Sequence, residues 1–143
     1  MGLPRDERQH ACELGVLLMK RIIVQTIPHD KQRYPTVGDW FDAHGLTVFR
    51  ISNMENEFYE RLVFIHEFIE QTLCLKRGIT EWSVDAFDMA YEDNRRAGDD
   101  SEPGDSELAP YYAEHQFATA IERRMAEELD IDWDHYDRTV TDL

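Results

Sequence analysis

Basic residues and long apolar runs are both scarce in this chain, and each scarcity excludes a class of function. The 15 lysines and arginines stand against 30 acidic residues, which gives a net charge of −15 at pH 7. Such a surface repels nucleic-acid phosphates and anionic lipids, so we expect neither a nucleic-acid partner nor membrane docking. The closest approach to a membrane span, residues 11–24, is interrupted by Glu13, Lys20 and Arg21.

Cysteine is also rare, and the N-terminus lacks the features of a signal peptide. Cys12 and Cys74 are the two cysteines, too few for a disulfide framework, so we expect reduced thiols in a cytoplasmic protein of a bacterial host cell. Residues 5–8 mix both charges, which is not typical of a secretion signal. Residues 1–18 are a candidate N-terminal extension, and residues 19–143 are expected to form a single domain.

The first half of this expected domain favours β-strands. Residues 21–27 are rich in β-branched side chains and end before Pro28, which predicts a strand. Residues 37–42 and 46–52 predict a hairpin that turns at residues 42–45.

The second half favours helices. Ser52 and Glu55 fit a capping box, which predicts a long helix from there to Arg77, with Gly78 ending it. Further helices are expected over residues 81–95, with Thr80 as the cap, and over residues 111–129. Strands followed by helices predict an α+β fold with three main helices.

Two segments fall outside these helices. Residues 97–110 hold glycines, prolines and many acids, which predicts a mobile acidic loop. The acidic tail, residues 130–143, is expected to pack through Trp133 and Tyr136.

The central helix carries a polar arc beside its apolar surface. The helical wheel places Leu62, Ile65 and Ile69 on the apolar side, and Phe68 and Leu75 are expected to widen it. The opposite arc holds the ionisable side chains. These are His66, Glu67 and Glu70.

His66 and Glu70 are four residues apart, so an imidazole and a carboxylate stand one above the other and can reach one cation. Glu67 lies to the side, where a base acting on a bound water would sit. The alternative is a solvated polar stripe that holds no metal.

Two later helices place ionisable groups at the edge of the expected core. His115 and Glu122 flank a predicted apolar stripe through Phe117, Ile121 and Met125, and Asp88 borders the apolar side of the middle helix. Burying a bare charge is costly, so such groups must be paired, metal-bound or neutral. His115 and Glu122 could simply pair with each other. Three helices with such groups instead favour one shared site, with Asp88 and Glu122 as additional members.

The motif His66-Glu67-x-x-Glu70 resembles that of the zincins, His-Glu-x-x-His, in which two histidines hold zinc and the glutamate activates water. The resemblance implies that His66 is a metal ligand, Glu67 the general base and His115 a third ligand. Glu70 stands where zincins have histidine, a change that could favour Mn²⁺ over zinc. The implied function is a zinc-type hydrolase or peptidase-like protein.

From residue 19 onward the chain also resembles small uncharacterised proteins encoded by phages and prophages. That likeness implies no established activity. The motifs that carry it are Tyr34-x-x-Val37-Gly38-Asp39-Trp40, His66-Glu67-x-x-Glu70, Val84-Asp85-x-Phe87-Asp88, and Glu114-His115 followed by Ile121-Glu122.

Two other functions stay open. Glu67-x-x-Glu70 followed by Asp85-x-x-Asp88 resembles the acidic motifs of all-α nucleoside triphosphate pyrophosphohydrolases, which implies Mg²⁺ held by these four carboxylates. The expected strands fit that all-α fold badly. The third hypothesis is a non-catalytic phage interaction module, which binds a protein partner or a second copy of the chain.

Overall fold

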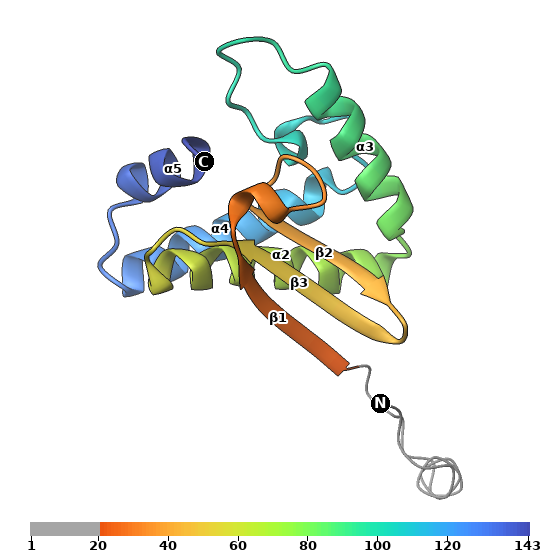
Figure 1. Ribbon diagram of the computed structural model, residues 1–143, viewed down its shortest axis with the longest axis horizontal. Helices are drawn as coiled ribbons and strands as arrows, with labels where there is room; N and C mark the ends of the chain where they lie inside the picture. Colours follow the sequence, from red (N-terminus) through yellow and green to blue (C-terminus); the bar gives the residue numbers. More distant parts are fainter. Residues whose placement is uncertain (1–20) are drawn as a thin grey trace, which may run out of the picture.

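The computed structural model describes residues 21–143, and it has the α+β fold that the sequence predicts. The expectation of an extension over residues 1–18 lies outside the described residues. The strands precede the α-helices, as Figure 1 shows, and the short 3-10 helix η1 lies between β1 and β2. The elements are β1 (Arg21–Ile27), η1 (His29–Lys31), β2 (Gly38–Ala43), β3 (Leu46–Ser52), α2 (Glu57–Arg77), α3 (Glu81–Asp93), η2 (Pro103–Asp105), α4 (Tyr112–Glu128) and α5 (Trp133–Thr141).

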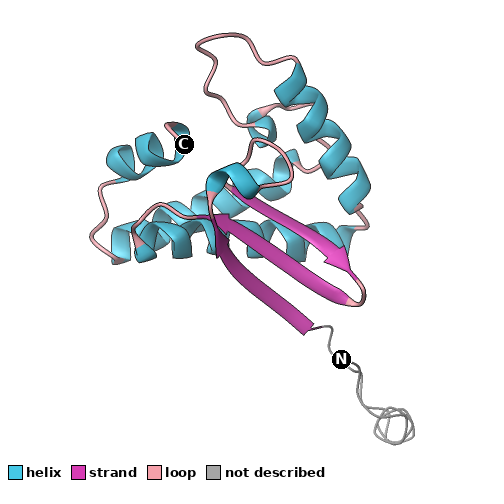
Figure 2. Ribbon diagram, viewed as in Figure 1, coloured by secondary structure: helices cyan, strands magenta, loops and turns pink. Residues whose placement is uncertain are grey.

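The strands form one sheet in the order β1-β3-β2, with β1 parallel and β2 antiparallel to β3. The predicted hairpin is present: Ala43 pairs with Leu46, which leaves a two-residue loop of His44 and Gly45. Both loop residues have positive φ, 50° and 79°, as a tight hairpin turn with the twist of its strands requires. Helix α2 packs across the sheet, and α4 packs along α2 (Figure 2).

The predicted start of α2 is wrong, whereas its end is confirmed. Ser52 is the last residue of β3, and Asn56 caps the helix by accepting hydrogen bonds from the backbone N–H groups of Phe58 and Tyr59. The capping-box pattern failed because strand pairing already uses the Ser52 backbone. Gly78 ends the helix with φ 71°, as a left-handed cap should.

The predicted apolar side of α2 is only partly the buried side. Leu62 is fully buried as expected, but Phe68 is 38% exposed and Leu75 is 70% exposed. Several polar-arc residues point inward instead. The buried residues of the helix are Tyr59, Leu62, Val63, His66, Glu70, Gln71 and Cys74.

Helix α4 departs from its prediction in the same way. Phe117, Ile121 and Met125 are exposed, although the wheel predicted them in the core; Phe117 is 52% exposed. The inward residues are small or ionisable, and the core lies where Ala118 and Ala126 let α4 approach α2. The buried residues of α4 are Glu114, His115, Ala118, Glu122 and Ala126.

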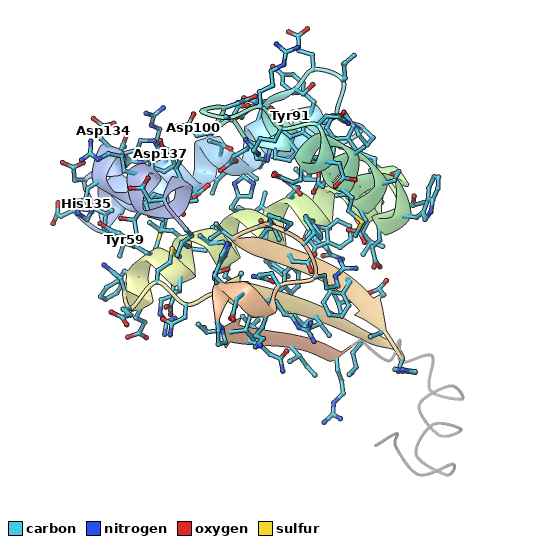
Figure 3. The ribbon with its side chains drawn as sticks, turned by 45° about the horizontal axis from the view of Figure 1, so that its top comes forward. Tyr59, Tyr91, Asp100, Asp134, His135 and Asp137 are labelled. Carbon is cyan, nitrogen blue, oxygen red and sulfur yellow. The ribbon has the colours of Figure 1, made fainter. Side chains whose placement is uncertain are left out.

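The C-terminal tail is more regular than predicted, because residues 133–141 form helix α5. Its expected anchors are confirmed: Tyr136 is buried and Trp133 packs against the same cluster. The Tyr59 hydroxyl of α2 lies 2.7 Å from His135 Nδ1 of α5 (Figure 3). Within residues 97–110 the short helix η2 forms, while the mobility of this loop stays a prediction.

No helix among residues 21–143 combines the length and the apolar character that crossing a membrane would demand.

Candidate metal centre

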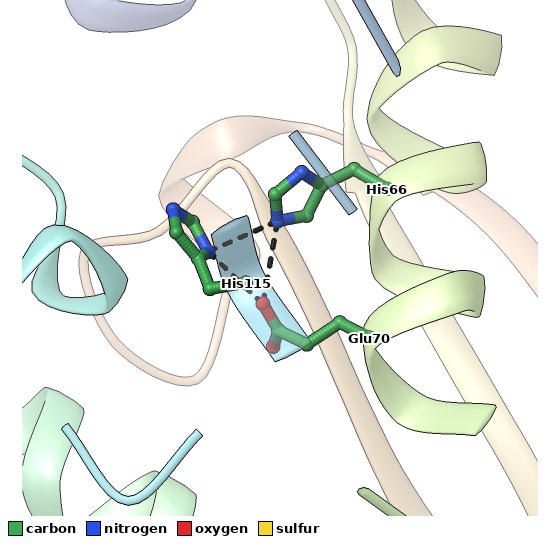
Figure 4. A group of neighbouring side chains, drawn as sticks. All are labelled: His66, Glu70 and His115. Atoms are coloured by element: carbon green, nitrogen blue, oxygen red, sulfur yellow. Dashed lines mark hydrogen bonds and ion pairs between the residues drawn. The ribbon is translucent and has the colours of Figure 1, made fainter. Parts of the chain in front are cut away.

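Three predicted ligands converge on one point inside the protein. His66 and Glu70 project from adjacent turns of α2, and His115 reaches them from α4 (Figure 4). His66 Nε2 lies 3.1 Å from His115 Nδ1, and Glu70 Oε2 lies 3.3 Å from the first nitrogen and 3.0 Å from the second. The predicted convergence is therefore confirmed.

The spacing of these three atoms suits one cation. Bonds of about 2.0–2.2 Å in a tetrahedral site place ligand atoms roughly 3.4 Å apart, close to the separations found here. All three side chains are buried, with residue exposures of 7%, 5% and 5% for His66, Glu70 and His115. This buried His66, Glu70 and His115 group could hold a metal ion.

The other nitrogen of His66 is held by a carboxylate. Glu122 Oε2 lies 2.8 Å from His66 Nδ1, and the buried Tyr136 hydroxyl donates a hydrogen bond to Glu122 Oε1. Such a carboxylate fixes the tautomer of a ligating histidine and leaves Nε2 free to bind metal. Glu122 thus contacts the ring nitrogen of His66 that does not belong to the triangle of ligand atoms. It is not a further ligand, and it does not pair with His115.

The imidazoles and carboxylates shift one another's pKa values. Burial lowers the pKa of His66, but hydrogen bonding to Glu122 and Glu70 outweighs burial and raises it well above the usual value. Burial likewise lowers the pKa of His115, while Asp105, Glu102 and Glu70 raise it to about 12.

The site therefore attracts positive charge strongly. For Glu70, burial raises the pKa, but hydrogen bonds with His115 and His66 prevail and lower it to about 2. The two facing ring nitrogens lie 3.1 Å apart and cannot both carry a proton without conflict, although one proton can lie between them. One cation bonded to both nitrogens and to the carboxylate removes this conflict, so the donor set fits a metal.

Glu67 lies beside the ligands, against the start of β2. A Cβ atom at Gly38 would stand 2.5 Å from Glu67 Oε1, so only glycine permits this approach. Burial, and then the charge of Glu70, raise the pKa of Glu67 well above its usual value. Glu67 and the three ligands line a single cavity of about 410 Å³.

Asp85 and Asp88 are occupied elsewhere. Arg33 donates hydrogen bonds to Asp85, and the hydroxyls of Tyr34 and Tyr111 donate to Asp88. Asp88 is buried, yet neither aspartate joins a group of three metal-binding side chains within residues 21–143. The four carboxylates of the pyrophosphohydrolase motif are thus not assembled around one ion.

Sequence reasoning missed the carboxylates that face the far side of His115. Glu102 Oε2 and Asp105 Oδ1 lie 3.2 Å and 3.4 Å from His115 Nε2. Both belong to the loop that was predicted to be mobile. No periodicity marks a loop residue that approaches a helix, and the motif Pro103-Gly104 offered the only sign of a tight local turn.

Comparison of the chain with models of protein families, with curated proteins and with solved structures finds no match. The case for function therefore rests on the geometry of the site.

Proposed function

We propose that this protein is a divalent-metal-dependent hydrolase, with zinc held by His66, Glu70 and His115 and with Glu67 as general base. The observation that carries the proposal is the triangle of ligand atoms, 3.0–3.3 Å on each side, at the wall of a cavity that Glu67 also lines. Two histidines and one glutamate are a ligand set of catalytic zinc, which keeps a further position for water or substrate.

The role of each protein group follows from its place. When bound, the ion would polarise water and the substrate as a Lewis acid. Glu67 takes the proton from the attacking water and returns it to the leaving group. Glu122 holds the His66 ring in the orientation that presents Nε2.

The cavity also favours one kind of substrate. Acidic side chains line it, and Arg95 is the only arginine or lysine among its described lining residues. A wall of this charge favours neutral or cationic groups over polyphosphates. This charge supports hydrolysis of an ester or amide bond more than nucleotide pyrophosphohydrolysis.

The test uses Glu67→Gln, which keeps the size of the side chain but removes the base. We expect zinc content and melting temperature to stay near those of the parent. Zinc-dependent turnover of a panel of chromogenic esters, fluorogenic peptides and nucleoside triphosphates should be confined to an ester or peptide, and it should fall about 10²-fold or more in the variant.

Two results would contradict the proposal: turnover that survives Glu67→Gln, or a zinc-loaded parent that hydrolyses none of these probes. The second result would favour the interaction module. Magnesium-dependent cleavage of the triphosphates alone would favour the pyrophosphohydrolase.

A further inference from the structure

His115 faces carboxylates with both of its ring nitrogens, but in different ways. Its Nδ1 belongs to the triangle with His66 and Glu70. Its Nε2 lies near Glu102 and Asp105, yet it is buried without a hydrogen bond, because neither oxygen lies along the direction of an Nε2–H bond. A buried imidazole nitrogen without a hydrogen-bond partner thus lies within 3.4 Å of two carboxylates.

The local sequence of η2 builds this arrangement. The Asp105 backbone N–H donates to the Glu102 carbonyl oxygen, and the Glu102 backbone N–H donates to the Asp105 side chain. Gly104 lies between them against the His115 ring, where a Cβ atom would stand 2.3 Å from Cγ. The chain therefore presents two carboxylates beside the edge of one imidazole, at a spot that admits no side chain in between.

The three ligand atoms are spaced for a cation. One atom from each of Glu102, Asp105 and His115 lies within 4.8 Å of the other two. The Glu102 and Asp105 side chains are about half exposed, at 51% and 53%, whereas His115 is buried. An ion here would be reached from solvent and would exchange faster than one bound at the inner triangle.

We propose that His115 Nε2, Glu102 and Asp105 form a second divalent-cation site, so that the His115 imidazole bridges two metal ions. The inference rests on the proposed function only in sharing His115 with the first site. Coordination through both nitrogens requires the ring to release its N–H proton to solvent. One imidazole with two carboxylates suits Zn²⁺ or Mn²⁺, and a second cation offsets the acidic lining of the cavity.

The test is calorimetric titration of the chelator-treated protein with Zn²⁺. We expect two equivalents in the parent, the second bound at least about tenfold more weakly because its carboxylates are half exposed. The variant Glu102→Gln/Asp105→Asn should bind one equivalent. The control Asp100→Asn/Glu107→Gln removes the same charge from exposed residues of the same loop and should keep two.

A spectroscopic measurement reports the bridge itself. Two Cu²⁺ ions that share one imidazole couple their spins, so the electron paramagnetic resonance intensity should fall as the second equivalent binds to the parent. Glu102→Gln/Asp105→Asn should keep the spectrum of a single isolated ion. Circular dichroism of each variant verifies that it is folded.

The outcomes separate the two sites. A single equivalent in the parent that His66→Ala abolishes, or two equivalents in Glu102→Gln/Asp105→Asn, overturns the second site. A single equivalent that only becomes weaker in this variant shows that the carboxylates merely position His115, which also overturns it. If the parent binds a single equivalent that His66→Ala leaves in place and Glu102→Gln/Asp105→Asn removes, the second site is supported and the inner one is contradicted.

Discussion

The inner and outer faces of the α2 and α4 pair contrast sharply. The inner face buries His66, Glu70, His115 and Glu122, whereas the outer face leaves apolar side chains such as Phe117 in contact with solvent. In most two-layer domains the apolar stripe turns inward. Here a connected set of hydrogen-bonded imidazoles and carboxylates occupies part of the space between α2 and α4.

This contrast distinguishes the candidate metal centre from the rest of the molecule. A buried ionisable group costs free energy unless it is paired or neutralised. Four such groups gathered between two helices therefore need a reason beyond stability, and a metal centre supplies one. The outer apolar residues need no such reason, since exposed apolar side chains are common on protein surfaces.

The largest expected effect is a loss of unfolding free energy when a buried residue of the inner face is replaced. His66→Ala leaves Glu70 and Glu122 buried with one partner fewer, and we expect unfolding free energy to fall by about 3 kcal/mol. Leu75→Ala on the outer face of the same helix should change it by less than about 0.5 kcal/mol. Chemical denaturation of both variants measures the difference. Equal, small effects would show that the polar cluster contributes nothing to the fold.

A smaller effect concerns Asp88, which is buried but lies outside the metal ligands. Burial is the main cause that raises its pKa to about 7, despite the hydroxyl of Tyr111. The Asp88 carboxyl ionises near pH 4 in the unfolded chain but only near pH 7 in the folded protein. Asp88 therefore does not destabilise the folded protein below pH 4. It lowers the unfolding free energy increasingly between pH 4 and pH 7, and by a constant amount at higher pH.

Asp88→Asn removes that dependence. The rise of the Asp88 pKa to about 7 sets an upper limit of about 4 kcal/mol on the gain in unfolding free energy of the variant over the parent between pH 4 and pH 8, and we expect about half of it. Denaturant titrations at a series of pH values measure this change, and Asp142→Asn at the exposed end of α5 serves as a control that should show none. If the difference in unfolding free energy between Asp88→Asn and the parent stays constant with pH, Asp88 ionises normally.

The smallest expected effect tests how far the inner network extends. Tyr136→Phe removes the hydroxyl that holds Glu122 behind His66, so we expect zinc affinity to fall about tenfold. Tyr59→Phe removes a hydroxyl that joins α2 to α5 through His135 and does not contact Glu122. Chelator competition should separate the two variants. Equal affinities would place Tyr136 outside the metal centre.

The sequence predicted the elements better than it predicted which faces they bury. Runs rich in β-branched residues and the caps Thr80 and Gly78 depend on local chemistry, so the predicted strands and helix ends were largely correct. The wheel assumed that apolar residues face inward, and Phe117 and Leu75 show where that assumption failed. The failure has a physical cause: the space between α2 and α4 holds a polar cluster.

The residues of the candidate site were likewise only partly predictable from the sequence. The four-residue spacing of His66 and Glu70 is visible in the sequence because a helix places them together, and His115 stood out at the edge of a predicted stripe. Glu102 and Asp105 lie on a loop, and Tyr136 acts through Glu122 from the last helix. Such contacts depend on the tertiary fold, which no spacing along the chain encodes.

The most direct test of the central claim is the metal content of the purified protein together with its melting temperature, with and without chelator. The account predicts at least one tightly held divalent ion per chain, a melting temperature that chelator lowers, and loss of that ion in His66→Ala. A parent protein that carries and binds no divalent ion, and that melts identically with chelator present, would contradict it.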